Sequence, residues 1–253
     1  MAKNKLAKFA DLDKLDIVLQ YPYSVLKSED GFPYKGHWNE DVFMNTNPIV
    51  IELGCGRGEY TLGMARKYPH VNFIGIDIKG NRIWNGAMKA EDEQLPNVRF
   101  LRTEIEFLPH FFGPEEVSEI WLTFPDPQMK KTRKRLTSTR FLISYCEILG
   151  GDKILNLKSD SSFLYLYTKA VADANHLTIL EDYQDVYKEV ERGSDLRQIQ
   201  TYYERQWLAR GLDIKYLRIS LADLPDRWVE PDIDIPYDTY RSYGRNQRSE
   251  LNI

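Results

Sequence analysis

The amino-acid sequence predicts an α/β fold whose β-sheet is mostly parallel. Short apolar runs and helical runs alternate from Ile49 onward, and this β-α-β-α-β order is typical of strands that lie parallel in one sheet. A glycine-rich segment separates the first apolar run from the first helical run, as in folds that bind a nucleoside-containing ligand at that turn. The last two predicted strands, residues 176–186 and 214–221, are long, and we expect them to form an antiparallel pair.

The apolar runs predict seven strands in this sheet, and helical periodicity predicts the helices between them. The strands are expected at residues 49–53, 71–76, 98–101, 117–124, 153–157, 176–186 and 214–221. Helices are expected directly after the glycines and at residues 79–93, 137–149, 161–174 and 199–210. Thr137 or Ser138 is expected to cap the helix that begins there.

A chain of 253 residues fits one large α/β domain with appendages, and we expect that domain at residues 48–221. Residues 1–47 are polar and irregular, with a weak helical pattern at residues 9–19, and are expected to form an N-terminal arm. Residues 222–253 lack sustained periodicity, so they are expected to form a C-terminal tail that wraps the domain or stays mobile.

The composition indicates an ordinary globular protein, with 42% hydrophobic and 28% charged residues. A net charge of −4 means that any nucleic-acid surface must come from local clustering of basic residues. The sequence has neither a signal peptide nor an apolar run long enough to span a membrane, which predicts a cytoplasmic protein. Two distant cysteines and four scattered histidines predict no disulfide and no metal site.

The glycine-rich segment is the first candidate binding site. Glu52 is followed by Gly54, Gly56 and Gly58, and the glycines allow a tight turn and the approach of a ligand to bare backbone at Gly54 and Gly56. This spacing differs from the G-x-G-x-x-G of pyrophosphate-containing dinucleotides, so it favours a phosphate-free adenosine cofactor such as S-adenosyl-L-methionine (SAM). A glycine motif alone would fit a plain turn equally well.

Two acidic residues at later strand ends extend this candidate site. Asp77 closes the second strand, where a carboxylate can accept hydrogen bonds from both ribose hydroxyls of an adenosine. Glu104 follows the third strand and is expected near the adenine amine, although Glu106 offers the same group and both could be exposed residues at a helix start. Asp77 and the strand context favour the cofactor site over a plain turn.

A second candidate site follows the fourth strand. Pro125 and Pro127 bracket Asp126 and stiffen the backbone at the carboxyl edge of the sheet, where ligands bind in such folds. A rigid loop with a helix-capping aspartate is the structural alternative. Five positive charges follow within six residues and suggest contacts with RNA phosphates rather than a solvated loop. These basic residues are Lys130, Lys131, Arg133, Lys134 and Arg135.

The ordered set of motifs resembles the bacterial tRNA (guanine-N7-)-methyltransferase family over about residues 48–221. The proline-bracketed aspartate with its basic run and the late Thr-x-x-Glu are the most specific parts. The resemblance implies a Rossmann-like class I methyltransferase fold, SAM as methyl donor, S-adenosyl-L-homocysteine as product, and a guanosine in the variable loop of tRNA as target. The motifs are Glu52-x-Gly-x-Gly-x-Gly, Gly75-Ile76-Asp77, Phe124-Pro125-Asp126-Pro127, Leu157-Lys158-Ser159-Asp160 and Thr201-Tyr202-Tyr203-Glu204.

The resemblance also implies roles for single residues. It makes Asp126 the catalytic residue as well as a SAM contact. Gln128 departs from the family, which often has tryptophan there, and Asp77 stands where the family often has glutamate. The implied SAM contacts are Glu52, Asp77, Glu104 and Asp126, and the implied substrate contacts are Lys130, Asp160, Thr201 and Glu204.

The chemistry of the target atom predicts catalysis by positioning. Guanine N7 carries an in-plane lone pair, so its attack on a SAM methyl group needs no base to remove a proton first. Two other functions compete with this one: a class I methyltransferase that acts on another RNA, a protein or a small molecule, and a non-catalytic RNA-binding protein. The basic run argues against a protein or small-molecule substrate, and the glycine loop with Asp77 argues against a non-catalytic protein, whereas another RNA stays an alternative. No obligatory protein partner is predicted.

Overall fold

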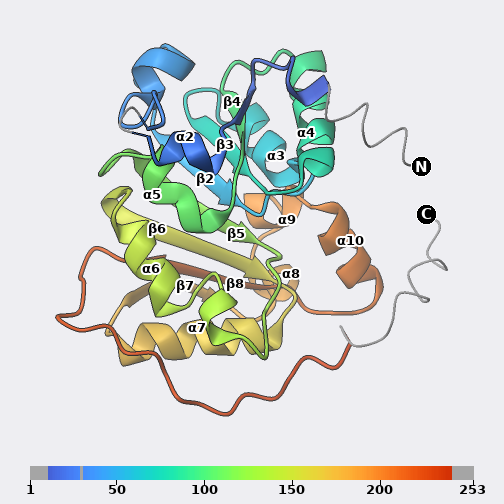
Figure 1. Cartoon of the computed structure of the whole chain (residues 1–253). Helices are drawn as coiled ribbons and strands as arrows, with labels where there is room; N and C mark the ends of the chain where they lie inside the picture. The colour runs from blue at the N-terminus through green and yellow to red at the C-terminus, as the bar shows by residue number, and fades with distance from the viewer. Residues whose placement is uncertain (1–10, 29–30, 241–253) are drawn as a thin grey trace.

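The computed structural model describes residues 11–28 and 31–240, which form one eight-stranded sheet with helices on both faces (Figure 1). The strand order is β1-β4-β3-β2-β5-β6-β8-β7. Neighbouring strands from β1 to β6 are parallel, and β8 is antiparallel to both β6 and β7. The strands are β1 (Val18–Gln20), β2 (Ile49–Leu53), β3 (Asn72–Ile76), β4 (Val98–Arg102), β5 (Val117–Thr123), β6 (Leu149–Ser159), β7 (Thr178–Tyr183) and β8 (Lys215–Ser220).

The expected α/β fold with an antiparallel final pair is confirmed, but the sheet has eight strands instead of seven. The additional strand is β1, which pairs with the edge strand β4 through Val18 and Phe100. A three-residue strand is too short to show alternation in the sequence, so the weak helical pattern of residues 9–19 hid it. Strand β6 is also longer than expected, because it begins at Leu149 and includes two glycines.

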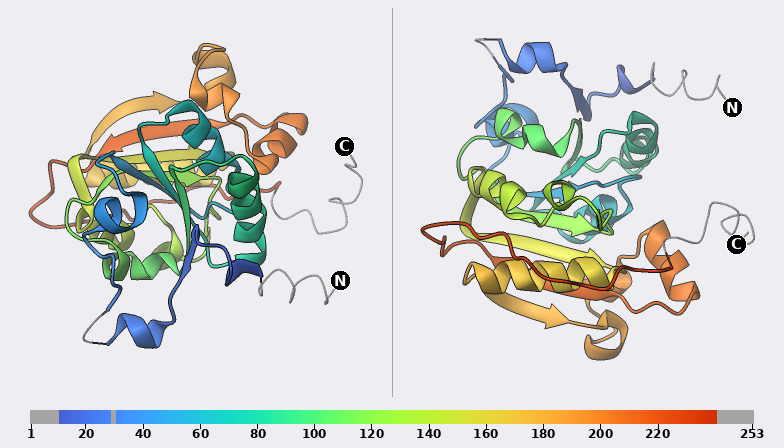
Figure 2. Two further views of the ribbon diagram at one scale, coloured as in Figure 1. Left: turned by 90° about the horizontal axis from the view of Figure 1, so that it is seen from above. Right: turned by 60° about the horizontal axis from the view of Figure 1, so that its bottom comes forward.

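Helices cover both faces of the sheet in the order that the sequence implies (Figures 1 and 2). The longer helices are α3 (Glu59–Lys67), α4 (Gly80–Asp92), α6 (Thr139–Cys146), α7 (Ser162–Ala174) and α10 (Tyr202–Ala209). Short helical segments are α2 (Tyr23–Leu26), η1 (Trp38–Phe43), η2 (Ile105–Phe107), α5 (Leu108–Phe111), η3 (Thr132–Lys134), α8 (Val186–Glu189) and α9 (Asp195–Gln198). Segments α8 and α9 lie where the sequence suggested only a loop.

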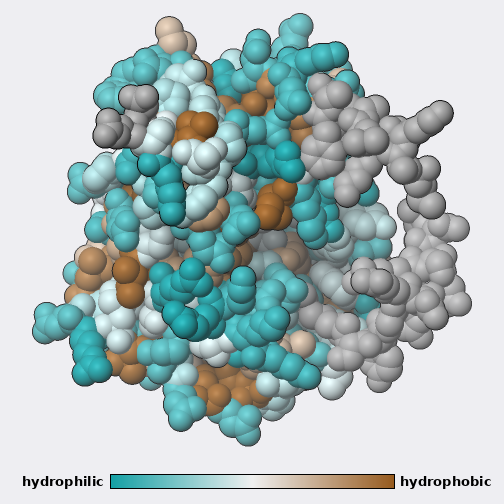
Figure 3. All heavy atoms as spheres, in the orientation of Figure 1, coloured by the Kyte–Doolittle hydropathy of each residue, from teal (hydrophilic) through white to brown (hydrophobic). Residues whose placement is uncertain are grey.

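Alternation along the central strands divides the interior into two hydrophobic cores. Val50 belongs to the core under α3 and α4, whereas Ile49 and Ile51 belong to the core under α5, α6 and α7. The strands are therefore buried on both sides, which explains their continuous apolar sequences. Figure 3 shows that the surface in the view of Figure 1 is mostly hydrophilic, with hydrophobic residues in small separate groups.

The described part of the C-terminal tail runs beside α7 and contacts both of its ends (Figure 2). Near the carboxyl end of α7, Asn175 exchanges two hydrogen bonds with the backbone of Val229, at 2.7 and 2.8 Å. At the amino end, Asp238 accepts hydrogen bonds from the Ser161 hydroxyl and from the backbone N–H of Phe163. The tail thus reaches the sheet edge where β6 ends. No helix within the described ranges is long and apolar enough to cross a membrane.

Candidate active site

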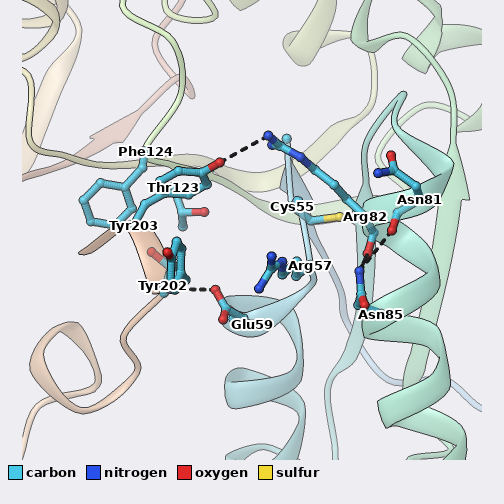
Figure 4. Close-up of a pocket in the computed structure, with 13 residues that line it drawn as sticks. Cys55, Arg57, Glu59, Asn81, Arg82, Asn85, Thr123, Phe124, Tyr202 and Tyr203 are labelled. Carbon is cyan, nitrogen blue, oxygen red and sulfur yellow. Dashed lines mark hydrogen bonds between the residues drawn. The ribbon is translucent and has the colours of Figure 1, made fainter. Parts of the chain in front are cut away.

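A pocket of about 330 Å³ lies at the carboxyl edge of the sheet, where β2 and β5 end (Figure 4). This edge is the usual ligand-binding position in open α/β sheets. The glycine loop, the first turns of α4, the end of β5 and the start of α10 form its walls. The lining residues are Gly54, Cys55, Gly56, Arg57, Glu59, Asn81, Arg82, Asn85, Thr123, Phe124, Thr201, Tyr202 and Tyr203.

The glycine loop has the conformation that its sequence predicts. Gly54, Gly56 and Gly58 have φ angles of +78°, +58° and +68°, in the left-handed region that side chains disfavour. A Cβ atom at Gly58 would also lie 2.7 Å from the ring of Phe100, so the helix α3 can begin there only with glycine. At Gly54 a Cβ would meet nothing within 4 Å, so the backbone of this residue faces open space in the pocket wall.

Glu52 holds the glycine loop from inside the fold and does not line the pocket. It is 4% exposed and accepts hydrogen bonds from the Thr61 N–H at 2.9 Å and from the hydroxyls of Thr61 and Thr123. Burial raises the pKa of Glu52 to about 7, although these hydrogen bonds lower it. In this structure Glu52 ties β2 to α3 and to the end of β5, and its expected SAM contact stays a prediction.

Asp77 and Glu104 lie on the edge where the sequence places them. Asp77 is 8% exposed and accepts hydrogen bonds from Gly56 N–H at 3.0 Å and from Lys79 N–H at 2.8 Å. It therefore joins the glycine loop to the start of α4. Glu104 is exposed and caps η2 directly after β4. The alternative acid, Glu106, lies 4.0 Å from Lys134.

Asp126 is exposed on a loop with an unusual backbone. Phe124 precedes it with φ +53° and donates its N–H to the Lys158 carbonyl at 2.8 Å, which ties the loop to β6. One carboxylate oxygen of Asp126 accepts the Gln128 N–H at 3.1 Å, and Gln128 itself has φ +48°. Phe124 lines the pocket, so Asp126, two residues later, lies near the pocket although it is not one of the lining residues.

The basic run divides into exposed residues and one buried residue. Lys130, Lys131, Arg133 and Lys134 are exposed on the loop that leads to α6. Arg135 is only 8% exposed and donates hydrogen bonds to the carbonyls of Gln128 at 3.3 Å and Met129 at 2.8 Å. Its guanidinium also lies over the rings of Phe163 and Tyr167. Arg135 therefore holds the loop against α7, and its predicted phosphate contact stays a prediction.

The predicted substrate residues of α10 have different environments. Thr201 lines the pocket and caps α10 by accepting the Glu204 N–H at 3.1 Å. Glu204 is fully buried, and its Oε1 lies 2.7 Å from the buried Lys158 ammonium and also accepts the Tyr187 hydroxyl at 2.9 Å. Its Oε2 accepts a hydrogen bond from the same ammonium at 2.8 Å. The structure thus holds the Glu204 carboxylate inside the protein, and its predicted substrate contact stays a prediction.

Asp160 follows β6 and is covered by the tail. It is 1% exposed, and the Tyr240 hydroxyl donates a hydrogen bond to its carboxylate at 2.6 Å. The ring of Tyr240 packs edge-on against Trp207 of α10. Sequence reasoning missed Tyr240, because contacts between residues so far apart in the chain leave no periodic signal.

Sequence reasoning also missed four pocket residues that meet in two pairs. The Arg57 guanidinium lies 5.4 Å from the ring centroid of Tyr202, and Arg82 donates to the Tyr203 hydroxyl at 3.2 Å (Figure 4). Their positions within the glycine loop, in the first turn of α4 and inside the Thr-x-x-Glu motif were the available signals. Among residues 11–28 and 31–240, no group of three or more histidine, cysteine, aspartate or glutamate side chains is arranged to hold a metal.

The glycine loop, the acidic strand ends and the pocket at the sheet edge define a class I methyltransferase fold, and a solved structure agrees. This structure, "an antibiotic related Methyltransferase", has a TM-score of 0.53 at 17% identity and covers 72% of this chain and 90% of that one. A family described as "Putative methyltransferase" matches residues 46–217.

The chain belongs to the tRNA (guanine-N(7)-)-methyltransferase family. It is 53% identical over 234 residues to the protein of that name from Porphyromonas gingivalis, with 92% of this chain and 96% of the relative covered. It is 50% identical over 253 residues to the one from Bacteroides thetaiotaomicron, with 99% of this chain and 98% of the relative covered. The similarity therefore includes most of the tail as well as the core.

Proposed function

We propose that this protein transfers the methyl group of SAM to N7 of a guanosine in the variable loop of tRNA. The observation that carries the proposal is the pocket at the sheet edge, formed by the glycine loop and with Asp126 near it, in a chain that shares half its residues with named tRNA (guanine-N(7)-)-methyltransferases. An in-plane lone pair at N7 makes this reaction one of placement, because no proton has to be removed before attack.

The pocket fits a phosphate-free adenosine cofactor. Its volume of about 330 Å³ lies within the range of small-molecule sites, and Gly54 presents open backbone to it. In this proposal the backbone of Gly54 and Gly56 holds the cofactor, Asp77 accepts the ribose hydroxyls and Glu104 accepts the adenine amine. Asp126 contacts the cofactor beside the reacting atoms. SAM supplies an electrophilic methyl group on a sulfonium.

The remaining residues act on the tRNA. Thr201, which lines the pocket, and Asp126, two residues after the lining residue Phe124, orient the guanine. Lys130 contacts the substrate from the adjoining loop. Lys131, Arg133 and Lys134 neutralise phosphates, which is how basic side chains contribute most of the affinity for nucleic acid. Asp160 can engage the guanine only after Tyr240 moves away from it.

The cofactor assignment is tested with Asp77→Ala. Loss of a charged acceptor should weaken SAM binding by about 1–3 kcal/mol in calorimetry without RNA. Asp77→Asn is the matched control, because the amide still offers one oxygen to the Gly56 or Lys79 N–H. Equal SAM affinity for wild type and the Ala variant would remove Asp77 from the cofactor site.

The activity is tested with tRNA isolated from a strain that lacks the gene. Purified protein and labelled SAM should yield N7-methylguanosine, and strand cleavage at N7-methylated bases should map it to the variable loop. Ribosomal RNA and a protein extract serve as competing substrates. Labelling of either in place of tRNA, or a methyl group at another guanine atom, would contradict the proposal.

A further inference from the structure

A groove of about 380 Å³ continues the pocket between α3, α4 and the start of α10. Arg57, Glu59 and Asn85 line both the groove and the pocket, so a bound strand could pass from one into the other. None of the residues assigned above to RNA binding lies in this groove.

The groove carries an excess of positive charge in a chain whose net charge is −4. Four of its lining side chains are cationic, whereas Glu59 is its one carboxylate: the cations are Arg57, Arg66, Lys89 and Arg205. Glu59 is engaged, because it accepts the Tyr202 N–H at 2.6 Å and lies 3.6 Å from Arg205. Outside the lining, Glu93 pairs with Arg66 at 2.6 Å and lies 4.0 Å from Lys89. The two carboxylates do not neutralise all four cations, and the uncompensated positive charge favours binding of a polyanion.

Two half-exposed tyrosines stand at the junction of groove and pocket. Tyr202 and Tyr203 are 38% and 41% exposed, and each has a guanidinium near its ring, Arg57 at 5.4 Å and Arg82 at 5.9 Å from the ring centroids (Figure 4). Exposed aromatic rings and guanidinium planes are the surfaces on which splayed RNA bases stack. The junction therefore offers a base platform next to a phosphate-binding track.

The groove and the basic loop lie on opposite faces of the sheet. The loop with Lys131 and Arg133 leads to α6, which packs on one core, whereas α3 and α4 pack on the other. A guanosine splayed into the pocket has RNA on both its 5′ and 3′ sides. Two basic surfaces that flank the pocket from opposite faces match that requirement.

We propose that the groove binds the ribose-phosphate backbone on one side of the target guanosine, while Tyr202 and Tyr203 stack the base at the junction. This inference rests on the proposed function, since it takes tRNA as the substrate. It adds a second RNA surface to the basic loop and assigns the two tyrosines to substrate placement.

The phosphate track is tested with Lys89→Gln, because the Lys89 side chain is 60% exposed at the groove. The plot of log affinity for tRNA against log salt should become shallower by about 0.7–0.9, the contribution of one phosphate contact. Lys169→Gln is the matched control, since Lys169 is also an ion-paired helical lysine but lies on α7, on the other face. Identical slopes of log affinity against log salt for the two variants would contradict phosphate binding in the groove.

The base platform is tested with Tyr203→Ala and Tyr203→Phe. Loss of one stacked base should raise the KM for tRNA about tenfold in the Ala variant, whereas the Phe variant keeps the ring and stays near wild type. The KM for tRNA should rise more than the KM for SAM in the Ala variant, since Tyr203 also lines the pocket assigned to SAM. If Tyr203→Phe raises the KM for tRNA as much as Tyr203→Ala does, the stacking role is wrong. The same conclusion follows if the KM for SAM rises and the KM for tRNA does not. Absence of N7 methylation by the wild type would instead refute the proposed function itself.

Discussion

The acidic residues around the pocket differ in their exposure and in their hydrogen bonds. Asp126 is exposed near the pocket, whereas Glu52 and Glu204 are buried and bonded within the protein. A buried carboxylate is retained only where hydrogen bonds or a counter-charge compensate its lost hydration. Glu52 has three hydroxyl or amide donors and Glu204 has Lys158, so both carboxylates hold neighbouring elements together.

The first prediction at this scale concerns Asp126. Asp126→Ala should abolish tRNA methylation and leave the fold intact, because the side chain is exposed. Asp126→Asn should retain more activity than Ala, since the role is placement and not proton abstraction. Single-turnover methylation of tRNA, with products read by cleavage at N7-methylguanosine, measures both. A wild-type rate in the Ala variant would exclude Asp126 from the mechanism.

The second concerns the pH dependence of stability through Glu52. Because burial raises its pKa from 4.5 to about 7, the folded state keeps a proton in this window that the unfolded state has lost. The contribution of Glu52 is therefore most favourable below about pH 4.5 and declines as pH rises to about 7. Glu52→Gln cannot ionise, so the unfolding free energy of wild type minus that of the variant should fall across this window in urea titrations. A difference independent of pH would contradict the prediction.

At the scale of elements, the site depends on how α10 and the basic loop are fixed to the sheet. The buried pair of Lys158 and Glu204 joins α10 to β6, and burial lowers the pKa of Lys158 while it raises that of Glu204. The contact between the two charges offsets these shifts. Thr201 reaches the pocket because this pair holds the helix it caps.

The basic loop yields the prediction at this scale. Replacing Lys131, Arg133 and Lys134 together with glutamine should weaken tRNA binding and flatten its salt dependence, because each lost phosphate contact removes about one released counterion. Arg135→Gln should instead lower the midpoint of thermal unfolding, since its guanidinium bonds two carbonyls and packs on two rings. An unchanged salt dependence of tRNA affinity in the triple variant would show that the loop is solvated and makes no phosphate contacts.

At the scale of the whole molecule, the two ends of the described chain complete the fold around the central domain. Strand β1 extends the sheet beyond β4, and the tail passes along α7 to the edge where β6 ends. The Tyr240 hydroxyl donates a hydrogen bond to the Asp160 carboxylate, which the family resemblance assigns to substrate binding. Under the proposed function, the tail would compete with a guanine for this carboxylate.

The prediction at this scale is a lower KM for tRNA in Tyr240→Phe. Guanine must break the bond from the Tyr240 hydroxyl to reach Asp160, and hydrogen bonds to charged groups contribute about 1.5–3 kcal/mol. The control is Tyr237→Phe, because Tyr237 lies on the same segment and is 51% exposed. SAM binding should be equal in all three proteins. A higher KM would show that the hydroxyl supports Asp160 and does not block it.

The sequence by itself determined the order of strands and helices, the glycine loop, and the strand ends at which Asp77, Glu104 and Asp126 lie. These features are local, since they follow from periodicity and from backbone preferences of glycine and proline within a few residues. Only the tertiary structure decided which charged residues are exposed and which are buried. The basic run does not distinguish Arg135 from its neighbours, yet packing against α7 buries it. The same holds for Glu204, paired with a lysine 46 positions away, and for Asp160, covered by a tyrosine 80 positions away. Burial depends on contacts between distant segments, and a single sequence does not record them.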